Sequence, residues 1–263
     1  MIRFFDSVPV GILPDGRWAL LDTGCNGGDI LANAPTAPVD VGGELVHPTV
    51  VPNLDVEGIA RGIGAPRLDM LVGVDVLCRG FSLDLRHGNA EFKARPPLPD
   101  EETVAVLPYT RPATGMLTSP LVTVELGGQP VEGVFDTGAS YSLWRLRKED
   151  PGRPAHTMRS DFHVGKNGQI VDFPVLGRRE SMRIGDSTIE LDIAYMPESL
   201  LTAAERPGLI VGMDVPAALG ATAVVLDPDR REILFYGLRS IQKIDCRNHY
   251  RLHVASRSMA EPG

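Results

Sequence analysis

The tripeptide Asp-Thr-Gly occurs twice in this sequence, and it is the strongest chemical signal in the chain. The two copies are Asp22-Thr23-Gly24 and Asp136-Thr137-Gly138. Two carboxylates held close together cannot both ionise at low cost, so such a pair shares one proton. The ionised member can deprotonate a water while the protonated member polarises a carbonyl. Glycine lets the two backbones approach closely, and a threonine hydroxyl can bond to the facing loop.

The surroundings of the two triplets also match, with an offset of 114 residues (136 − 22). Each triplet ends a short apolar run that follows a turn, Pro14-Asp15-Gly16 or Gly127-Gly128. Further along, Leu71-Val72-Gly73 matches Ile210-Val211-Gly212, and we expect a short helix and then a strand pair after each. In these strand pairs an aspartate precedes a phenylalanine by eight residues, Asp84 to Phe92 and Asp227 to Phe235. Matched blocks in one order indicate an internal repeat.

The repeat defines the domain organisation that we expect. It comprises an N-terminal lobe (1–95), a linker (96–117), a C-terminal lobe (118–240) and a tail (241–263). The 28 glycines and 22 prolines favour a sheet-rich fold with many tight turns over a helical bundle. The expected fold class is therefore all-β and bilobal.

The second copy of the repeat is longer than the first between its Asp-Thr-Gly and the next matched glycine. Asp22 lies 20 residues before Gly42, whereas Asp136 lies 49 residues before the matching Gly185. The added segment includes 143–146, where we expect a short helix. It also holds Gly165-Lys166-Asn167-Gly168 between apolar flanks, which is a hairpin signal. We expect this hairpin to be a flap that closes over bound substrate, and the N-terminal lobe to have none.

The sequences around the triplets, Ala-Leu-Leu-Asp-Thr-Gly and Gly-Val-Phe-Asp-Thr-Gly-Ala-Ser, resemble the active-site loops of pepsin-like and retropepsin-like aspartic peptidases. The apolar-apolar-Gly segments resemble the strand that runs beneath those loops. The resemblance implies two retropepsin-like β-barrel lobes with short helices, a central cleft and a shared sheet. It also implies peptide hydrolysis by a water between Asp22 and Asp136, with Thr23, Gly24, Thr137 and Gly138 supporting the loops and no metal or cofactor.

The sequence departs from the pepsin-like pattern directly after each glycine. Cys25 and Ala139 stand where those enzymes place a serine or threonine. A hydroxyl there would bond to an ionised carboxylate and lower its pKa, so we expect a less acidic pair than pepsin's. Cys25 could instead be a nucleophile, but a small buried thiol is the favoured interpretation because no histidine is adjacent in sequence.

Composition limits the partners. The net charge is −8 and no basic run is present, which disfavours nucleic acid and anionic membranes. No apolar stretch approaches the roughly 18 residues of a membrane span, and the N-terminus is unlike a signal peptide. Three separated cysteines favour reduced thiols and a cytoplasmic location, or a periplasmic one if a signal peptide was removed. We expect a monomer that binds a peptide or protein substrate, because both half-sites lie in one chain.

Other interpretations stay open. A fold can outlast its chemistry, so the chain could be an inactive peptide-binding or assembly protein. Cys246, His249 and His253 have ligand-like spacing, but solvated side chains in a tail are the favoured interpretation. Asp84 and Asp227 recur at strand ends, where we expect them to stabilise turns.

Overall fold

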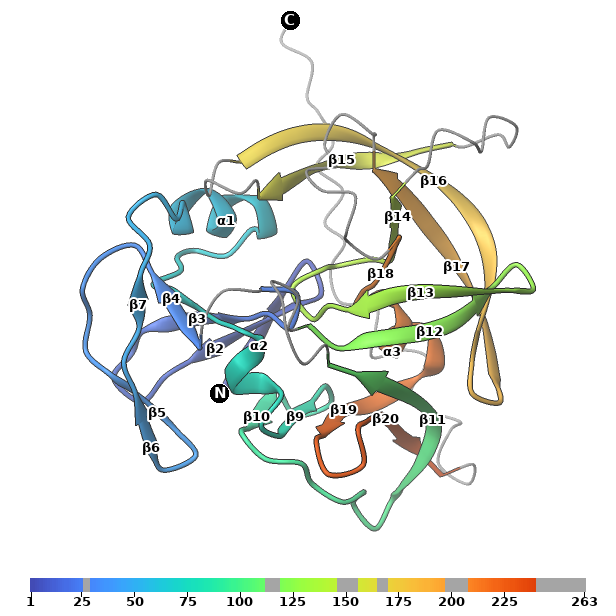
Figure 1. Ribbon diagram of the computed structural model, residues 1–263, viewed down its shortest axis with the longest axis horizontal. Coiled ribbons are helices and arrows are strands. Elements are labelled where there is room, and N and C mark those ends of the chain that lie inside the picture. The colour runs from blue at the N-terminus through green and yellow to red at the C-terminus, as the bar shows by residue number, and fades with distance from the viewer. Residues whose placement is uncertain (26–28, 112–118, 146–155, 165–169, 197–207, 240–263) are drawn as a thin grey trace, which may run out of the picture.

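The computed structural model is built mainly of β-strands arranged in two lobes (Figure 1). It describes residues 1–25, 29–111, 119–145, 156–164, 170–196 and 208–239. The three helices in this part of the chain are α1 (Val56–Ile63), α2 (Val74–Leu77) and α3 (Asp214–Leu219). None of them has the length and apolar character needed to cross a membrane. The predicted all-β, bilobal fold class is confirmed.

The N-terminal lobe contains a six-stranded sheet in the order β1-β2-β3-β8-β4-β7. Its strands are β1 (Ile2–Phe5), β2 (Val8–Ile12), β3 (Trp18–Leu21), β4 (Ile30–Ala32), β7 (Thr49–Val50) and β8 (Met70–Val72). A separate hairpin joins β5 (Val39–Val41) to β6 (Glu44–Val46). Its turn uses positive φ angles at Gly42 and Gly43, a conformation that favours glycine.

Helix α1 covers one face of this sheet. Asp55 caps its first turn by accepting a hydrogen bond from the Gly58 N–H (2.7 Å), and Gly64 ends it with a φ of +76°. Its apolar residues recur at the three- and four-residue spacing of a helix face. That face packs in one buried cluster with Leu20 of β3, Leu31 of β4 and Leu71 of β8. The packing holds together the three strands that flank the first Asp-Thr-Gly.

A twelve-stranded sheet forms the C-terminal lobe and continues beneath both lobes, in the order β10-β9-β19-β20-β11-β12-β13-β18-β14-β17-β16-β15. From the first half of the chain come β9 (Phe81–Asp84), β10 (Asn89–Glu91) and β11 (Glu101–Thr110). From the second half come β12 (Leu121–Leu126), β13 (Gln129–Phe135), β14 (Leu143–Arg145), β15 (His156–Val164), β16 (Ile170–Ile184), β17 (Ser187–Met196), β18 (Leu209–Val211), β19 (Ala221–Asp227) and β20 (Glu232–Leu238). Strand β12 also pairs with β16, so this part of the sheet closes back on itself.

The same strand arrangement surrounds each Asp-Thr-Gly. In the N-terminal lobe β8 pairs in parallel with β3 and antiparallel with β4. In the C-terminal lobe β18 pairs in parallel with β13 and antiparallel with β14. Strand β4 also pairs in parallel with β7, as β14 does with β17. The apolar-apolar-Gly segments thus lie where the sequence predicted. Each lies between the strand that precedes the Asp-Thr-Gly turn of its lobe and the strand that follows this turn.

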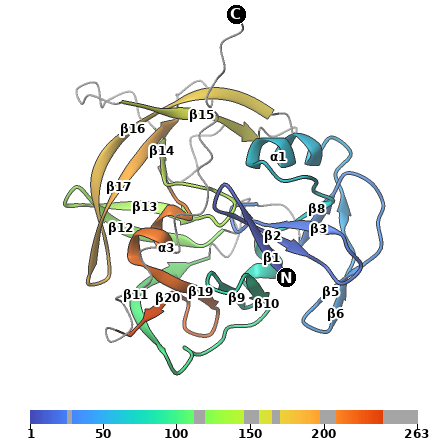
Figure 2. The same ribbon diagram turned by 180° about the vertical axis from the view of Figure 1, so that it is seen from behind.

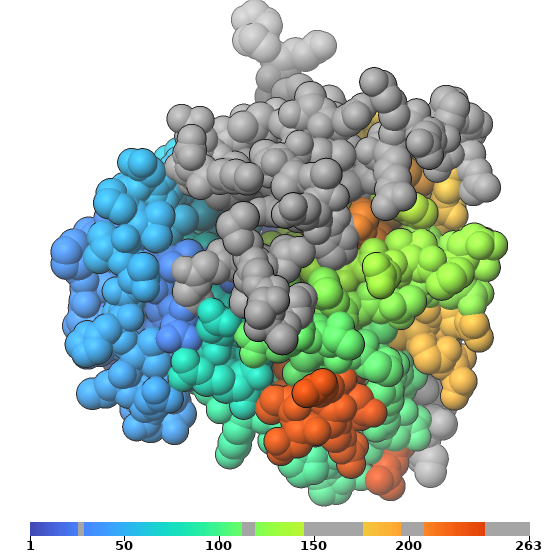
Figure 3. All heavy atoms as spheres, in the orientation of Figure 1, coloured from blue at the N-terminus to red at the C-terminus, as the bar shows by residue number. Residues whose placement is uncertain are grey.

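The lobes join through the pairing of β9 with β19, which places Leu83 opposite Val224. The β9–β10 and β19–β20 hairpins lie side by side at this junction (Figure 2). In the space-filling view the N-terminal lobe lies at the left and the C-terminal lobe at the right (Figure 3). Asp84 accepts hydrogen bonds from the backbone N–H groups of Arg86 and His87, and Asp227 accepts the equivalent pair. The predicted turn role of both aspartates is confirmed.

Two expectations about local structure are wrong. The predicted linker 96–117 contains the ten-residue strand β11, which pairs with β20 and β12. Its buried residues Ala105, Leu107 and Tyr109 alternate with more exposed ones, as a half-buried strand requires. Residues 143–145, expected to begin a helix, form β14 instead, because β18 and β17 supply strand partners on both sides.

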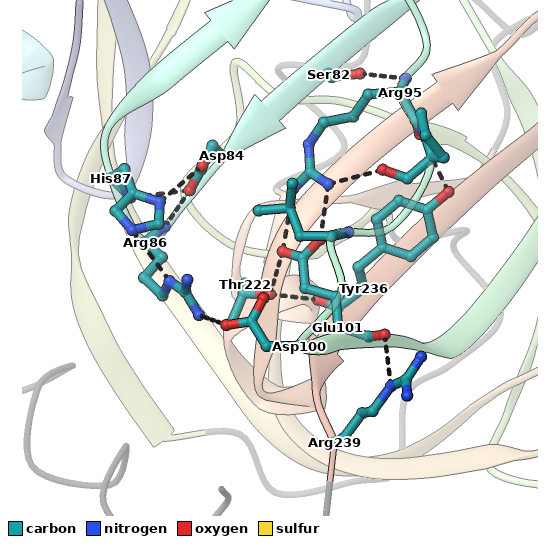
Figure 4. Close-up of polar contacts among 12 residues, drawn as sticks. Ser82, Asp84, Arg86, His87, Arg95, Asp100, Glu101, Thr222, Tyr236 and Arg239 are labelled. Carbon is teal, nitrogen blue, oxygen red and sulfur yellow. Dashed lines mark hydrogen bonds and ion pairs between the residues drawn. The ribbon is translucent and has the colours of Figure 1, made fainter.

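The connection into β11 is held by a buried ion pair (Figure 4). Glu101, 2% exposed, receives two hydrogen bonds from the Arg95 guanidinium, at 2.7 and 3.1 Å. It also accepts hydrogen bonds from the Leu98 N–H and from the Thr222 hydroxyl on β19. The Arg95 guanidinium lies 5.6 Å from the centre of the Tyr236 ring on β20. Arg95 and Leu98 lie in the connection itself and Thr222 lies on β19, so the contacts of this carboxylate tie the connection to the shared sheet.

Candidate active site

The two Asp-Thr-Gly turns leave their strands in the same way. The backbone N–H of Asp22 donates to the carbonyl of Val72 on β8, and that of Asp136 donates to Val211 on β18, both at 3.0 Å. Each turn then closes on its own aspartate carbonyl, which accepts the N–H of the residue three positions later at 3.3 Å. The strand beneath therefore sets the direction in which each carboxyl group leaves the backbone.

The threonines bind the two turns to each other. The Thr23 N–H donates to Thr137 Oγ1 (3.1 Å), and the Thr137 N–H donates to Thr23 Oγ1 (2.9 Å). Each hydroxyl donates in turn to a carbonyl of the opposite lobe, Thr23 to Phe135 (2.8 Å) and Thr137 to Leu21 (2.7 Å). Both side chains are fully buried. Four reciprocal hydrogen bonds with no exposure to water hold the turns at one fixed separation.

The glycines bring the carboxyl groups together. A Cβ placed on Gly24 would overlap the carboxyl of Asp136, and one placed on Gly138 would overlap that of Asp22. Each glycine N–H also donates to its own aspartate, Gly24 to Asp22 Oδ1 and Gly138 to Asp136 Oδ1, both at 2.8 Å. No residue with a side chain fits at either glycine, and this space is occupied by the facing carboxyl group.

The environment of Asp22 favours its protonated form. Burial raises the pKa of this carboxyl well above its ordinary value, and the charge of Asp136 and a hydrogen bond to the Asp136 side chain raise it further. Hydrogen bonds from the N–H groups of Gly24 and Cys25 act in the opposite direction but are weaker. A buried carboxyl that is hydrogen-bonded to a second one is the arrangement in which a proton is shared.

Cys25 is half-buried directly after the first triplet. Burial raises the pKa of its thiol, and the charges of Asp22, Asp136 and Asp75 raise it further. A nucleophilic cysteine needs a lowered pKa, so this environment suits a neutral thiol. In the part of the chain that the structure describes, no three His, Cys, Asp or Glu side chains gather to hold a metal ion. Cys246, His249 and His253 lie outside that part.

The predicted flap residues Gly165, Lys166, Asn167 and Gly168 also lie outside the described residues. The strands on either side of them are described, and they pair antiparallel as β15 and β16, with Val164 opposite Ile170. Strand β15 lies beside α1 of the N-terminal lobe (Figures 1 and 2). The expected hairpin strands are therefore present, and they extend from the C-terminal lobe toward the other lobe.

Sequence reasoning missed two polar residues next to the second turn. Asp214, at the start of α3, accepts hydrogen bonds from the backbone N–H and the hydroxyl of Ser142, both at 2.8 Å. Burial raises the pKa of Asp214 to about 6, against the lowering effect of the Ser142 bonds. Asp214 matches Asp75 in the repeat, and a matched acidic residue behind each apolar-apolar-Gly segment was an available signal.

Comparisons with known proteins add little to this geometry. No protein-family model matches the chain, and no curated protein matches it. Among solved structures, the chain is similar to the EIAV protease complexed with the inhibitor HBY-793, at 18% identity and a TM-score of 0.29. The match covers 41% of this chain and 95% of the viral protease chain. The fold described above stands on the strand pairings of the chain itself.

Proposed function

We propose that this protein is an aspartic endopeptidase that hydrolyses peptide bonds with a water activated between Asp22 and Asp136. The supporting observation is the pair of facing turns, in which each glycine lies against the carboxyl of the opposite lobe. The reciprocal threonine bonds hold these turns together without exposure to solvent. A structural role alone would not require two carboxyl groups to be buried against one another, since keeping one of them protonated at neutral pH destabilises the folded state.

The reaction follows from the shared proton. The ionised carboxyl takes a proton from the water, whose oxygen attacks the carbonyl carbon of the peptide. The protonated carboxyl donates a hydrogen bond to the carbonyl oxygen and so stabilises the negative charge that develops there. The resulting tetrahedral species breaks its C–N bond as the nitrogen receives a proton from the pair. One new carboxyl and one new amino group result, and no metal or cofactor takes part.

The remaining features have supporting roles in this proposal. Thr23 and Thr137 fix the separation of the turns, and Gly24 and Gly138 leave room for the carboxyl groups. The β15–β16 hairpin, including Gly165–Gly168, covers the substrate from the C-terminal lobe, and the N-terminal lobe supplies no flap. The substrate is a peptide or protein segment. The chain acts as a monomer, because it carries both half-sites, and we infer that the two lobes arose by duplication.

The test is cleavage of an unfolded protein substrate by the wild-type protein and by the variants Asp22→Asn and Asp136→Asn. Each variant is expected to lose at least about a thousandfold in turnover, because a single carboxyl cannot both activate water and polarise the carbonyl. Asp84→Asn is the matched control, since Asp84 stabilises a turn far along the chain. Mass spectrometry of the new peptide termini measures turnover. Substantial cleavage by either dyad variant would eliminate the mechanism.

The alternative function is peptide binding or assembly without hydrolysis. The same experiment distinguishes it from the proposed one if binding of the unfolded substrate is measured alongside cleavage. Binding that is equal in the wild-type protein and in Asp22→Asn, with no new peptide termini in either, would support the binding function. Cleavage that depends on both aspartates would exclude it.

A further inference from the structure

Ser142 lies at the point where the second Asp-Thr-Gly turn ends and β14 begins. It is fully buried, and all its hydrogen-bonding groups have partners. Its N–H and hydroxyl donate to the two carboxyl oxygens of Asp214, and its hydroxyl oxygen accepts the Gly212 N–H at 3.1 Å. Its carbonyl accepts the Ala194 N–H of β17 at 3.0 Å. One side chain thus joins the end of the turn to the segment that follows β18.

The same segment also holds the middle of the turn. The N–H of Met213, between Gly212 and Asp214, donates to the carbonyl of Ala139 at 2.9 Å. Ala139 follows Gly138, whose Cα faces the carboxyl of Asp22 in the other lobe. A shift of the Ser142–Asp214 contact would therefore move Ala139 and Gly138, and with them the surface against which the Asp22 carboxyl rests.

The matching part of the first lobe is held differently, since the Gly73 N–H, which matches that of Gly212, donates to the backbone carbonyl of Asp29 at 2.8 Å. In the sequence, the residue at the 114-residue offset from Ser142 is Gly28, which has no side-chain hydroxyl. The residue that matches Asp214 is Asp75, whose carboxylate instead binds the guanidinium of Arg111 at 2.9 Å, at the end of β11. Both members of that ion pair are about one-third exposed. Within the described residues, the acidic residue of the second lobe therefore has a buried contact with the end of its own Asp-Thr-Gly turn, whereas that of the first lobe forms a partly exposed ion pair.

We propose that Ser142 and Asp214 are positioning residues for the reaction, which set the Asp136 turn, and with it Gly138, at its distance from Asp22. This inference rests on the proposed function, because it assigns the pair a role in catalysis. Neither residue touches the reacting atoms. Their effect is on the geometry of a dyad in which small displacements of a carboxyl change how the proton is shared.

The test compares Ser142→Ala and Asp214→Asn with the matched control Asp75→Asn. The first variant removes the hydroxyl and leaves the Gly212 N–H without its acceptor. The second preserves the shape of the side chain but replaces one acceptor oxygen with a donor. Both are expected to lower kcat by about 10- to 100-fold with KM within about twofold of wild type, as misplacement of catalytic groups does. Asp75→Asn is expected to change kcat by less than about twofold, because it removes an exposed ion pair.

A second measurement is independent of turnover. The backbone amide of Gly138 donates to Asp136, and that of Gly24 donates to Asp22, so their NMR resonances report the two turns separately. In Ser142→Ala and Asp214→Asn the Gly138 resonance is expected to shift while that of Gly24 shifts less. In Asp75→Asn the Gly138 resonance is expected to remain in place. Melting temperatures identify any variant that does not fold.

The outcomes separate the two proposals. A Gly138 resonance that stays at its wild-type position in both folded variants would overturn the positioning inference, and so would an unchanged kcat. A loss of activity that follows a rise in KM, or a variant that loses activity only through unfolding, would also overturn it. If the wild-type protein shows no cleavage that depends on Asp22 and Asp136, the proposed function fails. The Gly138 resonance then still decides whether the pair sets the turn.

Discussion

Asp22 is a buried carboxyl whose folded-state pKa lies well above the ordinary value of 3.8. A raised pKa means that its contribution to stability is fully present below about pH 3.8 and is lost as the pH rises through the folded pKa. Asp22→Asn cannot ionise, so we expect it to melt at a higher temperature than the wild-type protein at neutral and alkaline pH. Each pKa unit corresponds to about 1.4 kcal/mol, or about 3 to 6 °C in Tm. Calorimetry across pH 3 to 9 measures the difference.

Asp84→Asn is a control, because its effect on stability should change with pH in the direction opposite to that of Asp22→Asn. Burial alone would raise the pKa of this carboxyl, but hydrogen bonds from His87 and Arg86 outweigh it and lower the pKa. Its contribution is therefore present above the ordinary value and is lost as the pH falls through the folded pKa. Asp84→Asn should be destabilised at neutral pH and approach the wild-type protein in acid. A pH trend of the same sign in Asp22→Asn and Asp84→Asn would contradict the assigned causes.

Cys25 and Ala139 lead to a prediction about the pH dependence of the carboxyl pair. Neither residue offers a hydroxyl to the carboxyl pair, so the pair should keep its shared proton to a higher pH than in pepsin-like enzymes. The double variant Cys25→Ser with Ala139→Ser should move the upper limb of the pH–kcat/KM profile to lower pH. Cys78→Ala, at a buried thiol of α2's C-terminal end, serves as the control. An upper limb that stays in place or moves upward would show that the hydroxyls do not act on the pair.

The two aspartates and the Ser142–Asp214 pair differ in how far the sequence alone predicts them. Asp22 and Asp136 were predictable because a rare functional triplet occurs twice at one offset, with matched strands on both sides. Ser142 and Asp214 were not, because serine and aspartate are common turn residues and their meeting depends on two segments separated by 72 residues. Their contact is a property of the fold, although the match between Asp214 and Asp75 in the repeat marks the acidic residue.

Among the helices and strands, the local sequence pattern predicted the turns and the strands beneath the triplets. The helix expected at 143–146 and the linker expected at 96–117 were wrong for physical reasons. Residues 143–145 hold a leucine and a tryptophan in a short run that suits a helix or a strand. The partner strands β17 and β18 decide between them. Strand β11 begins at the acidic end of a proline-rich segment, so Glu101 was expected in a linker. Its burial depends on Arg95 and Thr222, neither of which is evident from the segment itself.

Glu101 carries a prediction for the connection between the lobes. Glu101→Gln leaves the Arg95 guanidinium, 12% exposed, without its counter-ion. We expect a loss of about 3 kcal/mol in the free energy of unfolding at pH 7, as for other broken buried ion pairs. Burial raises the pKa of Glu101, but the bonds from Arg95, Leu98 and Thr222 outweigh it and lower the pKa. The difference between variant and wild type should therefore narrow as the pH falls below about 4.5.

Urea denaturation at pH 7 and pH 4 measures this effect. Glu91→Gln is the control, since Glu91 forms an exposed ion pair with Lys93 and should change stability by about 0.5 kcal/mol or less. Equal losses in Glu101→Gln and Glu91→Gln would show that the buried pair does not hold the connection.

The flap proposal makes a prediction about the β15–β16 hairpin. Val164 pairs with Ile170, so deletion of Lys166 and Asn167 leaves three residues to connect the strands, which is enough for a hairpin turn. We expect turnover to fall by about tenfold or more, because a shortened flap excludes water less well, while Tm changes by less than about 2 °C. Steady-state kinetics and calorimetry measure both quantities. Unchanged turnover would show that the hairpin is not a flap.

At the scale of the whole molecule, the two lobes are joined at two levels. The threonine bonds connect the turns at the proposed site, and the β9–β19 pairing connects the sheets beneath it. The buried cluster is continuous across this junction and includes Leu83 from the first half and Phe235 from the second. The dyad needs one carboxyl from each lobe, so an arrangement that couples the lobes also preserves the separation of Asp22 from Asp136.

This coupling predicts that the lobes unfold together. The chain has two tryptophans, Trp18 in β3 and Trp144 in β14, so each lobe carries its own fluorescent reporter. In Trp144→Phe the fluorescence follows the N-terminal lobe, and in Trp18→Phe it follows the C-terminal lobe. We expect Leu83→Ala, introduced into both, to remove about 2 to 5 kcal/mol of stability, because Leu83 is fully buried opposite Val224.

Thermal melts of the two single-tryptophan proteins, with and without Leu83→Ala, distinguish cooperative unfolding of the two lobes from independent unfolding. If the shared sheet makes the molecule one cooperative unit, both reporters show one transition and Leu83→Ala lowers both midpoints by the same amount. Leu45→Ala, at a side chain that is 66% exposed, should move neither midpoint. A shift of the Trp18 signal alone would mean that the lobes unfold independently. The threonine contacts at the dyad would then have to hold the two carboxyl groups together without support from the sheet.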